Sequence, residues 1–158
     1  MNGKIIIFII ILLLINSFID EYKKSKPDHK NSKKIMSKSE YRIAEYLDKL
    51  NVRYKLQYVF KGCRDKKYLP FDFAIIDEKG KVLLLIEYDG EQHFHPVKFY
   101  NCTDKVAIEN FKKCQKHDAM KNKFCKKRKI PLLRISYLDN KNMYKIIKRT
   151  LYEYNIIK

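Results

Sequence analysis

The chain has 158 residues, of which 46% are hydrophobic and 13% are aromatic. This length and composition exclude a disordered tail and indicate one domain with a hydrophobic core. The chain carries 35 Lys and Arg against 18 Asp and Glu, and its formal net charge of +17 favours a polyanionic partner, either nucleic acid or an anionic membrane. An AT-rich coding sequence would give the same excess of Lys without any selection for binding.

The N-terminal segment differs from the rest because residues 5–15 are wholly apolar. With the residues after it, this stretch reaches about 15 residues, which is short of the roughly 20 that cross a bilayer but suits the core of a signal peptide. The lysines over residues 22–38 favour a cytoplasmic flank, so a short anchor that contacts the membrane through residues 4–19 is an alternative. A third interpretation is that Met36 starts the protein and that the upstream segment is an extension of the gene model.

These interpretations predict different locations for the protein. A real leader implies a secreted or membrane-anchored protein, and an artefactual one implies a soluble intracellular protein. In each case the predicted organisation is a hydrophobic leader over 1–20, a basic linker over 21–36 and one folded domain over 37–158.

The predicted domain begins with a helix and a strand. A helix is expected from Ser37, because Ser37-x-x-Glu40 matches a capping box and apolar residues recur at helical spacing up to Leu50. Apolar and polar residues then alternate over 52–60, which is typical of a half-buried strand. Residues 61–69 are expected to form a basic loop.

Two more strands are predicted next, over 71–76 and 81–88, joined by a turn. The unbroken apolar run of the second indicates a central place in the sheet. A loop over 90–104, a helix over 105–127, a strand over 132–135 and a helix over 140–156 complete the chain. The order α-β-β-β-α-β-α predicts an α/β domain, of the α+β kind, with a central mixed four-stranded sheet flanked by helices.

Three acidic side chains are expected at one end of this strand pair. Alternation along the strand that ends in Glu87-Tyr88-Asp89 places Glu87 and Asp89 on the same side. Asp72 comes beside Glu87 if the two strands form a hairpin. Converging carboxylates are destabilised by repulsion and desolvation, which a hard divalent cation such as Mg²⁺ or Mn²⁺ offsets. Asp72, Glu87 and Asp89 are therefore predicted metal ligands, although each alone would also suit a solvated strand end.

A histidine is expected close to these carboxylates. Gly90 is predicted to turn the chain sharply after Asp89, so that His93 returns to the metal end of the strand. There His93 would serve as a general base for water or as a proton donor to the leaving oxygen. An ordinary loop histidine is the alternative.

The cysteines give no recognisable metal or redox motif. None of the pairs among Cys63, Cys102, Cys114 and Cys125 is spaced as C-x-x-C. Free thiols are therefore expected, and a structural zinc that uses some of them with His93 or His95 is the alternative.

The string Pro70-Phe71-Asp72-Phe73, followed by Ile86-Glu87-Tyr88-Asp89-Gly90-Glu91-Gln92-His93, resembles the PD-(D/E)XK nuclease superfamily. The likeness is to the branch similar to the very-short-patch repair endonuclease and to phage homing endonucleases with an E-D-H-D residue set. It covers about residues 37–140. The resemblance implies a restriction-endonuclease-like fold, hydrolysis of DNA and a Mg²⁺ or Mn²⁺ cofactor, in a group common in phages and large DNA viruses.

The resemblance also assigns roles to the strand residues. Asp72 is similar to the central metal ligand, Glu87 or Asp89 to the second ligand, and His93 to the catalytic histidine. The sequence departs from the superfamily pattern at Asp89, where that pattern has Lys. Lys121 or His93 would then have to supply the missing function.

Three helical residues complete the expected site. Glu40 resembles a helical glutamate that holds the metal or its waters, and Asp118 with Lys121 resembles a late acidic position. Each has a structural alternative, because Glu40 also closes the capping box. Asp118 and Lys121 have the spacing of an i,i+3 surface pair.

Two basic segments flank the expected site and are predicted to contact DNA phosphates. The residues concerned are Lys61, Arg64, Lys66 and Lys67 in the loop, and Lys123, Lys126, Lys127 and Arg128 on the long helix. A solvated charged face is the alternative.

The sequence therefore predicts a Mg²⁺-dependent endonuclease that acts on DNA. One alternative is a nucleic-acid-binding module with a decayed site, because Asp89 replaces the superfamily lysine. Another is a membrane-tethered interaction protein whose basic linker binds anionic lipid. The oligomeric state and any preference for a site or lesion are not fixed by the sequence.

Overall fold

The structure, a computed structural model, describes residues 11, 13, 36–98 and 102–158. The predicted leader and linker lie outside the described residues, apart from residues 11, 13 and 36. Residues Met36–Lys158 form one compact unit. Within the described part of the chain, no helix is long and apolar enough to cross a membrane.

A mixed four-stranded sheet forms the centre of this unit, with the strands in the order β1-β2-β3-β4. The strands are β1 (Tyr54–Tyr58), β2 (Phe71–Ile76), β3 (Val82–Asp89) and β4 (Leu132–Ser136). The pairs β1–β2 and β2–β3 are antiparallel, and β3–β4 is parallel. The predicted α+β class and mixed four-stranded sheet are confirmed, and the apolar run of β3 does occupy an inner strand.

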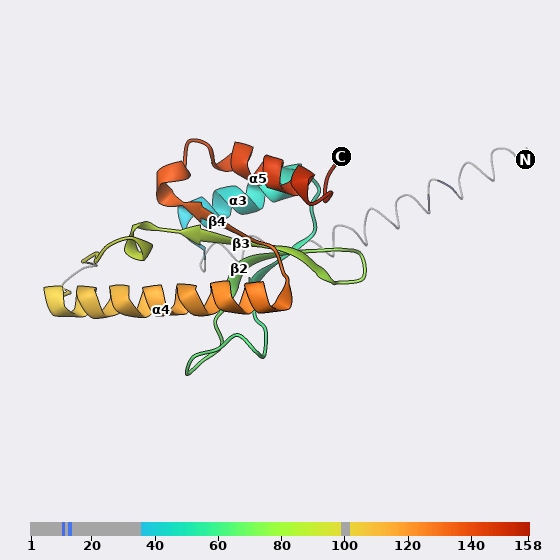
Figure 1. Cartoon of the computed structure of the whole chain (residues 1–158). Helices are drawn as coiled ribbons and strands as arrows, with labels where there is room; N and C mark the ends of the chain where they lie inside the picture. Colours follow the sequence, from blue (N-terminus) through green and yellow to red (C-terminus); the bar gives the residue numbers. More distant parts are fainter. Residues whose placement is uncertain (1–10, 12, 14–35, 99–101) are drawn as a thin grey trace, which may run out of the picture. The chain divides into compact units, whose positions relative to one another are not determined.

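Helices cover both faces of the sheet (Figure 1). The helices α3 (Lys38–Lys49) and α5 (Met143–Glu153) lie on one face, and α4 (Asp104–Arg128) lies on the other. Short 3-10 turns, η1 (Glu91–His93) and η2 (Tyr137–Asp139), follow β3 and β4. Along the chain the elements follow the order helix, three strands, helix, strand, helix.

Two hydrophobic clusters occupy the two sides of the sheet. In the larger cluster, Ile43 and Leu47 of α3 and Ile147 of α5 pack against the sheet. The smaller packs α4, through Cys125 and Phe124, against the opposite face. Because successive strand residues point to opposite faces, Leu84 and Ile86 join the first cluster while Leu85 joins the second. Glu87 and Asp89 have the parity of Leu85, so they face α4.

Several predicted boundaries differ from the structure by one to three residues. The last helix, predicted over 140–156, spans Met143–Glu153, because the 3-10 turn η2 and the turn after it come first. The strand predicted over 52–60 is shortened to Tyr54–Tyr58. Within it Gln57 has a left-handed φ of 47°, and the pairing with β2 passes from Leu56 to Tyr58. The long helix starts at Asp104 instead of 105, because the Thr103 side chain caps it by accepting a bond from the Val106 amide.

Candidate active site

A cavity of about 260 Å³ opens beside the C-terminal end of β3. Its charged lining comes from four elements: α3 supplies Glu40, β2 Asp72, β3 Glu87, and α4 Asp118 and Lys121. His93 of η1 and Cys114 of α4 also line it. Six of the seven predicted catalytic residues therefore meet at one cavity.

Asp72 is fixed in place by two hydrogen bonds. The backbone N–H of Tyr88 donates to Asp72 Oδ2 at 2.9 Å, and Gln57 Nε2 donates to Asp72 Oδ1 at 3.2 Å. The antiparallel pairing of Phe73 with Ile86, continued by one residue, sets Asp72 opposite Glu87. The hairpin expected from the sequence therefore forms and joins these two carboxylates.

Glu87 is an almost completely buried carboxylate, with 3% of its surface exposed. Burial and the nearby charge of Asp72 raise its pKa to about 7, against the opposing effect of Lys121. Lys121 Nζ donates to both carboxylate oxygens, at 2.8 Å and 2.9 Å. The ammonium of Lys121 also lies 5.2 Å from the centre of the Phe71 ring. Lys121 of α4 therefore forms a direct ion pair with Glu87 of β3.

Glu40 closes the capping box and also lies at the cavity. The capping box is complete, because Ser37 Oγ accepts from the Glu40 amide at 3.2 Å and the Glu40 carboxylate accepts from the Ser37 amide. The same side chain lines the cavity. Burial and the charge of Asp72 raise the pKa of Glu40. The capping hydrogen bonds therefore hold the Glu40 carboxylate close enough to Asp72 for that charge to raise the pKa of Glu40.

Asp89 is placed differently from the other predicted ligands and does not line the cavity. It is buried, and Arg134 of β4 binds both of its oxygens through Nε and Nη2. Arg134 Nη2 also lies 2.8 Å from Asp118 Oδ1. Burial alone would lower the pKa of Arg134, but the hydrogen bonds to these two carboxylates raise it. Asp89 is a partner of Arg134, and as a metal ligand it would have to give up that contact.

Asp118 and Lys121 of α4 do not form the i,i+3 surface pair that was the alternative. Asp118 bonds His93 and Arg134, while Lys121 bonds Glu87. Burial raises the pKa of Asp118, but the hydrogen bonds from His93 and Arg134 outweigh it and leave the pKa lowered. Both side chains therefore point at the site and not along the helix surface.

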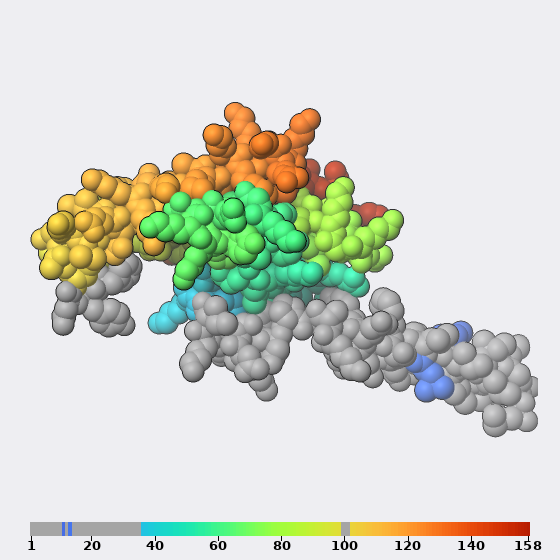
Figure 2. All heavy atoms as spheres, turned by 90° about the horizontal axis from the view of Figure 1, so that it is seen from below, coloured from blue at the N-terminus to red at the C-terminus, as the bar shows by residue number. Residues whose placement is uncertain are grey.

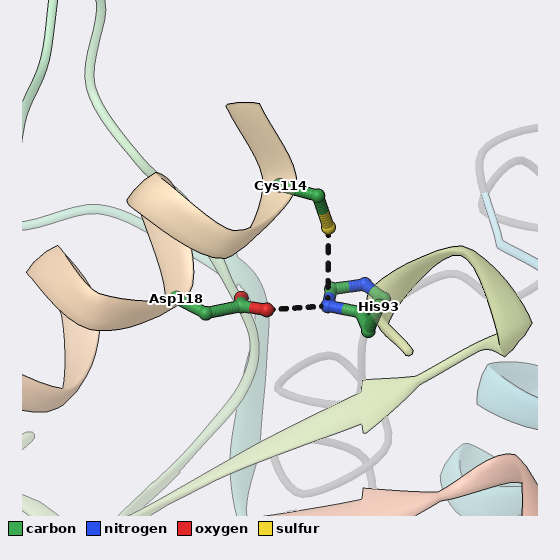
Figure 3. Close-up of side chains that lie close together, drawn as sticks. All are labelled: His93, Cys114 and Asp118. Atoms are coloured by element: carbon green, nitrogen blue, oxygen red, sulfur yellow. Dashed lines mark hydrogen bonds and ion pairs between the residues drawn. The ribbon is translucent and has the colours of Figure 1, made fainter. Parts of the chain in front are cut away.

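His93 is held by α4 through its Nδ1 atom (Figure 3). Asp118 Oδ2 lies 2.8 Å from Nδ1, and Cys114 Sγ lies 3.3 Å from it. The hydrogen bond to Asp118 raises the pKa of His93 despite its burial. Gly90 has φ of −67°, so the sharp turn predicted there needs no special backbone. A Cβ at Gly90 would instead lie 2.6 Å from Gln92 Oε1.

Two sets of side chains could hold a metal. Glu40, Asp72 and Glu87 offer oxygen atoms, which hard cations such as Mg²⁺ prefer. Burial, and then the charge of Asp72, raises the pKa of both glutamates, so their ionised forms are destabilised in a way that a bound divalent cation would offset. The trio His93, Cys114 and Asp118, whose ligand atoms lie within 4.8 Å of one another, suits a softer metal such as Zn²⁺. Burial, followed by the charge of Asp118, raises the Cys114 pKa to about 11, so its thiol stays protonated without a metal.

The basic residues predicted to contact DNA are all exposed. The loop that carries Lys61, Arg64, Lys66 and Lys67 is tied to α4 through Asp65. Asp65 binds Lys116 Nζ at 2.9 Å and His117 Nε2 at 3.3 Å. These contacts hold the basic loop beside the helix that carries the second basic segment. All four cysteines are free thiols, as expected.

Sequence reasoning missed three residues of this site. Arg134 stands in a strand where alternation gave it no special role, and its partner Asp89 belongs to a different strand. Gln57 gave no signal beyond a polar position in an alternating run. Cys114 lies one helical turn before Asp118, but no sequence pattern indicated that this face of the helix contacts His93.

Comparison with known proteins found one match. No curated protein and no solved structure matches the chain. Residues 53–153, well over half of the chain, match the family described as "Protein of unknown function (DUF2726)". The chain therefore belongs to this family.

Proposed function

We propose that this protein is a Mg²⁺-dependent endonuclease, also active with Mn²⁺, that hydrolyses phosphodiester bonds of DNA. The observation that carries the proposal is the meeting of Glu40, Asp72 and Glu87 from three elements at one cavity. Outside functional sites, like charges are seldom gathered in this way, because repulsion and desolvation destabilise them. The restriction-endonuclease-like architecture expected from the sequence is part of the proposal.

Asp72 and Glu87 would hold the metal, and Glu40 would bind it directly or through water. When bound, the ion would polarise the scissile phosphate and lower the pKa of an attacking water. Asp89 is left out of the proposed ligand set, because its carboxylate is bound by Arg134.

Lys121 takes the place of the lysine that the resembling superfamily carries at the position of Asp89. The ammonium of Lys121 forms an ion pair with Glu87, so it is next to a proposed metal ligand. There it can stabilise the negative charge that develops on the phosphate. His93 is the proposed base. With its Nδ1–H donated to Asp118, Nε2 is the basic atom that can accept a proton from water.

The test is cleavage of supercoiled plasmid by the full-length chain in mild detergent, with Mg²⁺ and with EDTA. Asp72→Asn and Glu87→Gln keep the shape of each side chain and remove its charge. Each is expected to lower the cleavage rate by at least about a hundredfold, as the loss of a metal ligand does. Glu78→Gln, an exposed acid of the β2–β3 turn, is the control and should cut normally. Wild-type rates in both variants would refute the proposal.

One observation favours a second function. The ion pair between Lys121 and Glu87 occupies a proposed metal ligand, and together with Asp89 at the lysine position it fits a nucleic-acid-binding module whose site has decayed. This alternative predicts DNA binding that weakens with salt, without cleavage in any metal. The plasmid assay of the wild-type protein separates the two.

A further inference from the structure

A second cavity, of about 510 Å³, lies between the end of β1, the β2–β3 turn and the C-terminal part of α4. It shares no lining residue with the cavity that holds the carboxylates. In the space-filling view the green segment around residue 60, the yellow-green turn and the orange end of α4 gather on one face (Figure 2). Lys61 and Arg128, two of its lining residues, are predicted phosphate contacts, but neither those contacts nor the proposed cleavage reaction accounts for its aromatic lining.

Aromatic rings form one wall of it. Phe60 packs against Tyr58 with the ring centres 5.0 Å apart, and against Phe124 at 5.1 Å. All three rings are half-buried, so part of each faces the cavity. A Cβ at Gly62 would lie 3.3 Å from the Phe124 ring, so the glycine lets the loop backbone run close to that ring.

The rim of the cavity is cationic. Lys61, Lys81 and Arg128 are exposed lining residues, and the Arg128 guanidinium lies 5.9 Å from the centre of the Phe124 ring. None of the described residues that line the cavity is acidic. The site therefore combines flat apolar surfaces with a cationic rim.

We propose that this cavity binds an unpaired nucleobase of single-stranded nucleic acid, with the flanking phosphates on Lys61, Lys81 and Arg128. Stacking on aromatic rings beside a basic groove is the general way in which proteins hold single strands. A base in a duplex is stacked and paired, so its faces are not accessible to such a pocket. An apolar ligand would leave the cations unused, and a simple anion would leave the rings unused.

Phe71 is fully buried and lines neither cavity, but it contacts lining residues of both. Its ring packs on Phe60 at 5.8 Å and on Phe124 at 6.4 Å, and Lys121 Nζ lies above it at 5.2 Å. The next residue in the chain is Asp72. The two cavities therefore lie close together, so we expect cleavage to favour single-stranded or unpaired regions.

The inference rests on nucleic acid being the substrate, but not on cleavage, so binding is measured in EDTA. The full-length chain in non-ionic detergent is titrated into an oligonucleotide that contains 2-aminopurine, as a single strand and as the matching duplex. We expect the fluorescence to change on stacking with the single strand and not with the duplex. Phe124→Leu and Arg128→Gln should each weaken single-strand binding about tenfold.

Tyr152→Leu removes an exposed aromatic ring from α5, on the other face of the sheet, and is the control. Arg128→Gln changes an exposed residue and reports on the site even if Phe124→Leu fails to fold. Equal fluorescence changes for single strand and duplex, no binding of the single strand, or normal binding by Arg128→Gln would overturn the proposal. So would vesicles of phosphatidylserine that bind in a Phe124-dependent way while the oligonucleotide does not.

The outcome is separable from that of the cleavage proposal. If the oligonucleotide stacks but no plasmid is cut, the endonuclease proposal fails and the base site stands. If plasmid is cut without stacking, the base site fails alone. Glu87→Gln, which should not cut, is expected to give the same fluorescence change as the wild type.

Discussion

At the scale of single residues, the contrast between Glu87 and Asp89 shows how two neighbouring acids come to do different things. Both lie on the same side of β3, and both are buried. Glu87 faces Lys121 of α4 and the cavity, whereas Asp89 faces Arg134 of the parallel strand β4. A bidentate guanidinium contact satisfies the hydrogen-bonding capacity of a buried carboxylate well, so Arg134 is the partner of Asp89 where Glu87 has Lys121 and the cavity.

His93 gives a prediction about pH and stability. Its pKa in the folded protein is raised above the ordinary value of 6.5, chiefly by the hydrogen bond to Asp118. The contact of protonated His93 with Asp118 therefore stabilises the fold fully below pH 6.5, and this stabilisation is lost as the pH rises through the raised pKa. The free energy of unfolding of wild type minus that of His93→Gln should shrink by on the order of 1 kcal/mol toward alkaline pH.

Urea unfolding in EDTA, repeated from about pH 5.5 to about pH 9, measures this difference. His95→Gln is the matched control, because His95 is exposed and its ion pair with Glu91 lies in solvent. The control difference should stay nearly constant. A wild-type advantage over His93→Gln that grows with pH would contradict the assignment. The same pKa requires cleavage to rise with pH, because only neutral His93 can accept a proton.

At the scale of elements, α4 supplies more of the site than any strand. Cys114, Asp118 and Lys121 recur at intervals of four and three residues, so they lie on one face of the helix, and that face covers the carboxyl end of β3. Their spacing was visible in the sequence. The sequence did not show which residues they contact, namely His93 of η1 and Glu87 of β3.

The helix α3 gives a prediction that separates capping from catalysis. Glu40→Gln keeps an oxygen that can accept from the Ser37 amide but removes the charge near Asp72. Because the pKa of Glu40 is raised, its ionised form is disfavoured in the folded protein, and the substitution should not lower the free energy of unfolding. Cleavage should fall about ten- to hundredfold.

Ser37→Ala is the matched variant, since it removes the cap and leaves the Glu40 carboxylate. It should cost about 1 kcal/mol of stability and leave most of the cleavage activity. Thermal unfolding and the plasmid assay together measure both quantities. If Glu40→Gln cut DNA normally and lost stability as Ser37→Ala does, Glu40 would be a capping residue alone.

Elements with a local signal could be predicted from the sequence, as could the meeting of Asp72 with Glu87 across the hairpin, but several other contacts between elements could not. The Ser37–Glu40 capping box and the apolar run of β3 are local, and both form as expected. The bond between Arg134 and Asp89 depends on the parallel pairing of β4 with β3, which no residue pattern fixes in register. The left-handed backbone of Gln57 is set by how β1 meets β2, so a polar residue in an alternating run gave no warning of it.

At the scale of the whole molecule, charge is divided between the faces of the sheet. The basic loop and the end of α4 lie on the side of the proposed site, joined by the contacts of Asp65 with Lys116 and His117. The helix α5, on the opposite face (Figure 1), also carries lysines. A net charge of +17 therefore does not by itself identify a binding face, and the location of the charges has to be tested.

Salt dependence provides that test, because each phosphate contact that is lost removes about 0.9 from the slope of log affinity against log salt. Lys126→Gln with Lys127→Gln, two exposed residues near the end of α4, should weaken DNA binding and reduce the slope by about 1.8 if both lysines contact phosphates. Lys145→Gln with Lys148→Gln makes the same change in charge on α5. Fluorescence anisotropy at several salt concentrations compares the two pairs. Since net charge is equal in both variants, an equal loss of slope would mean that binding follows total charge and not the α4 face.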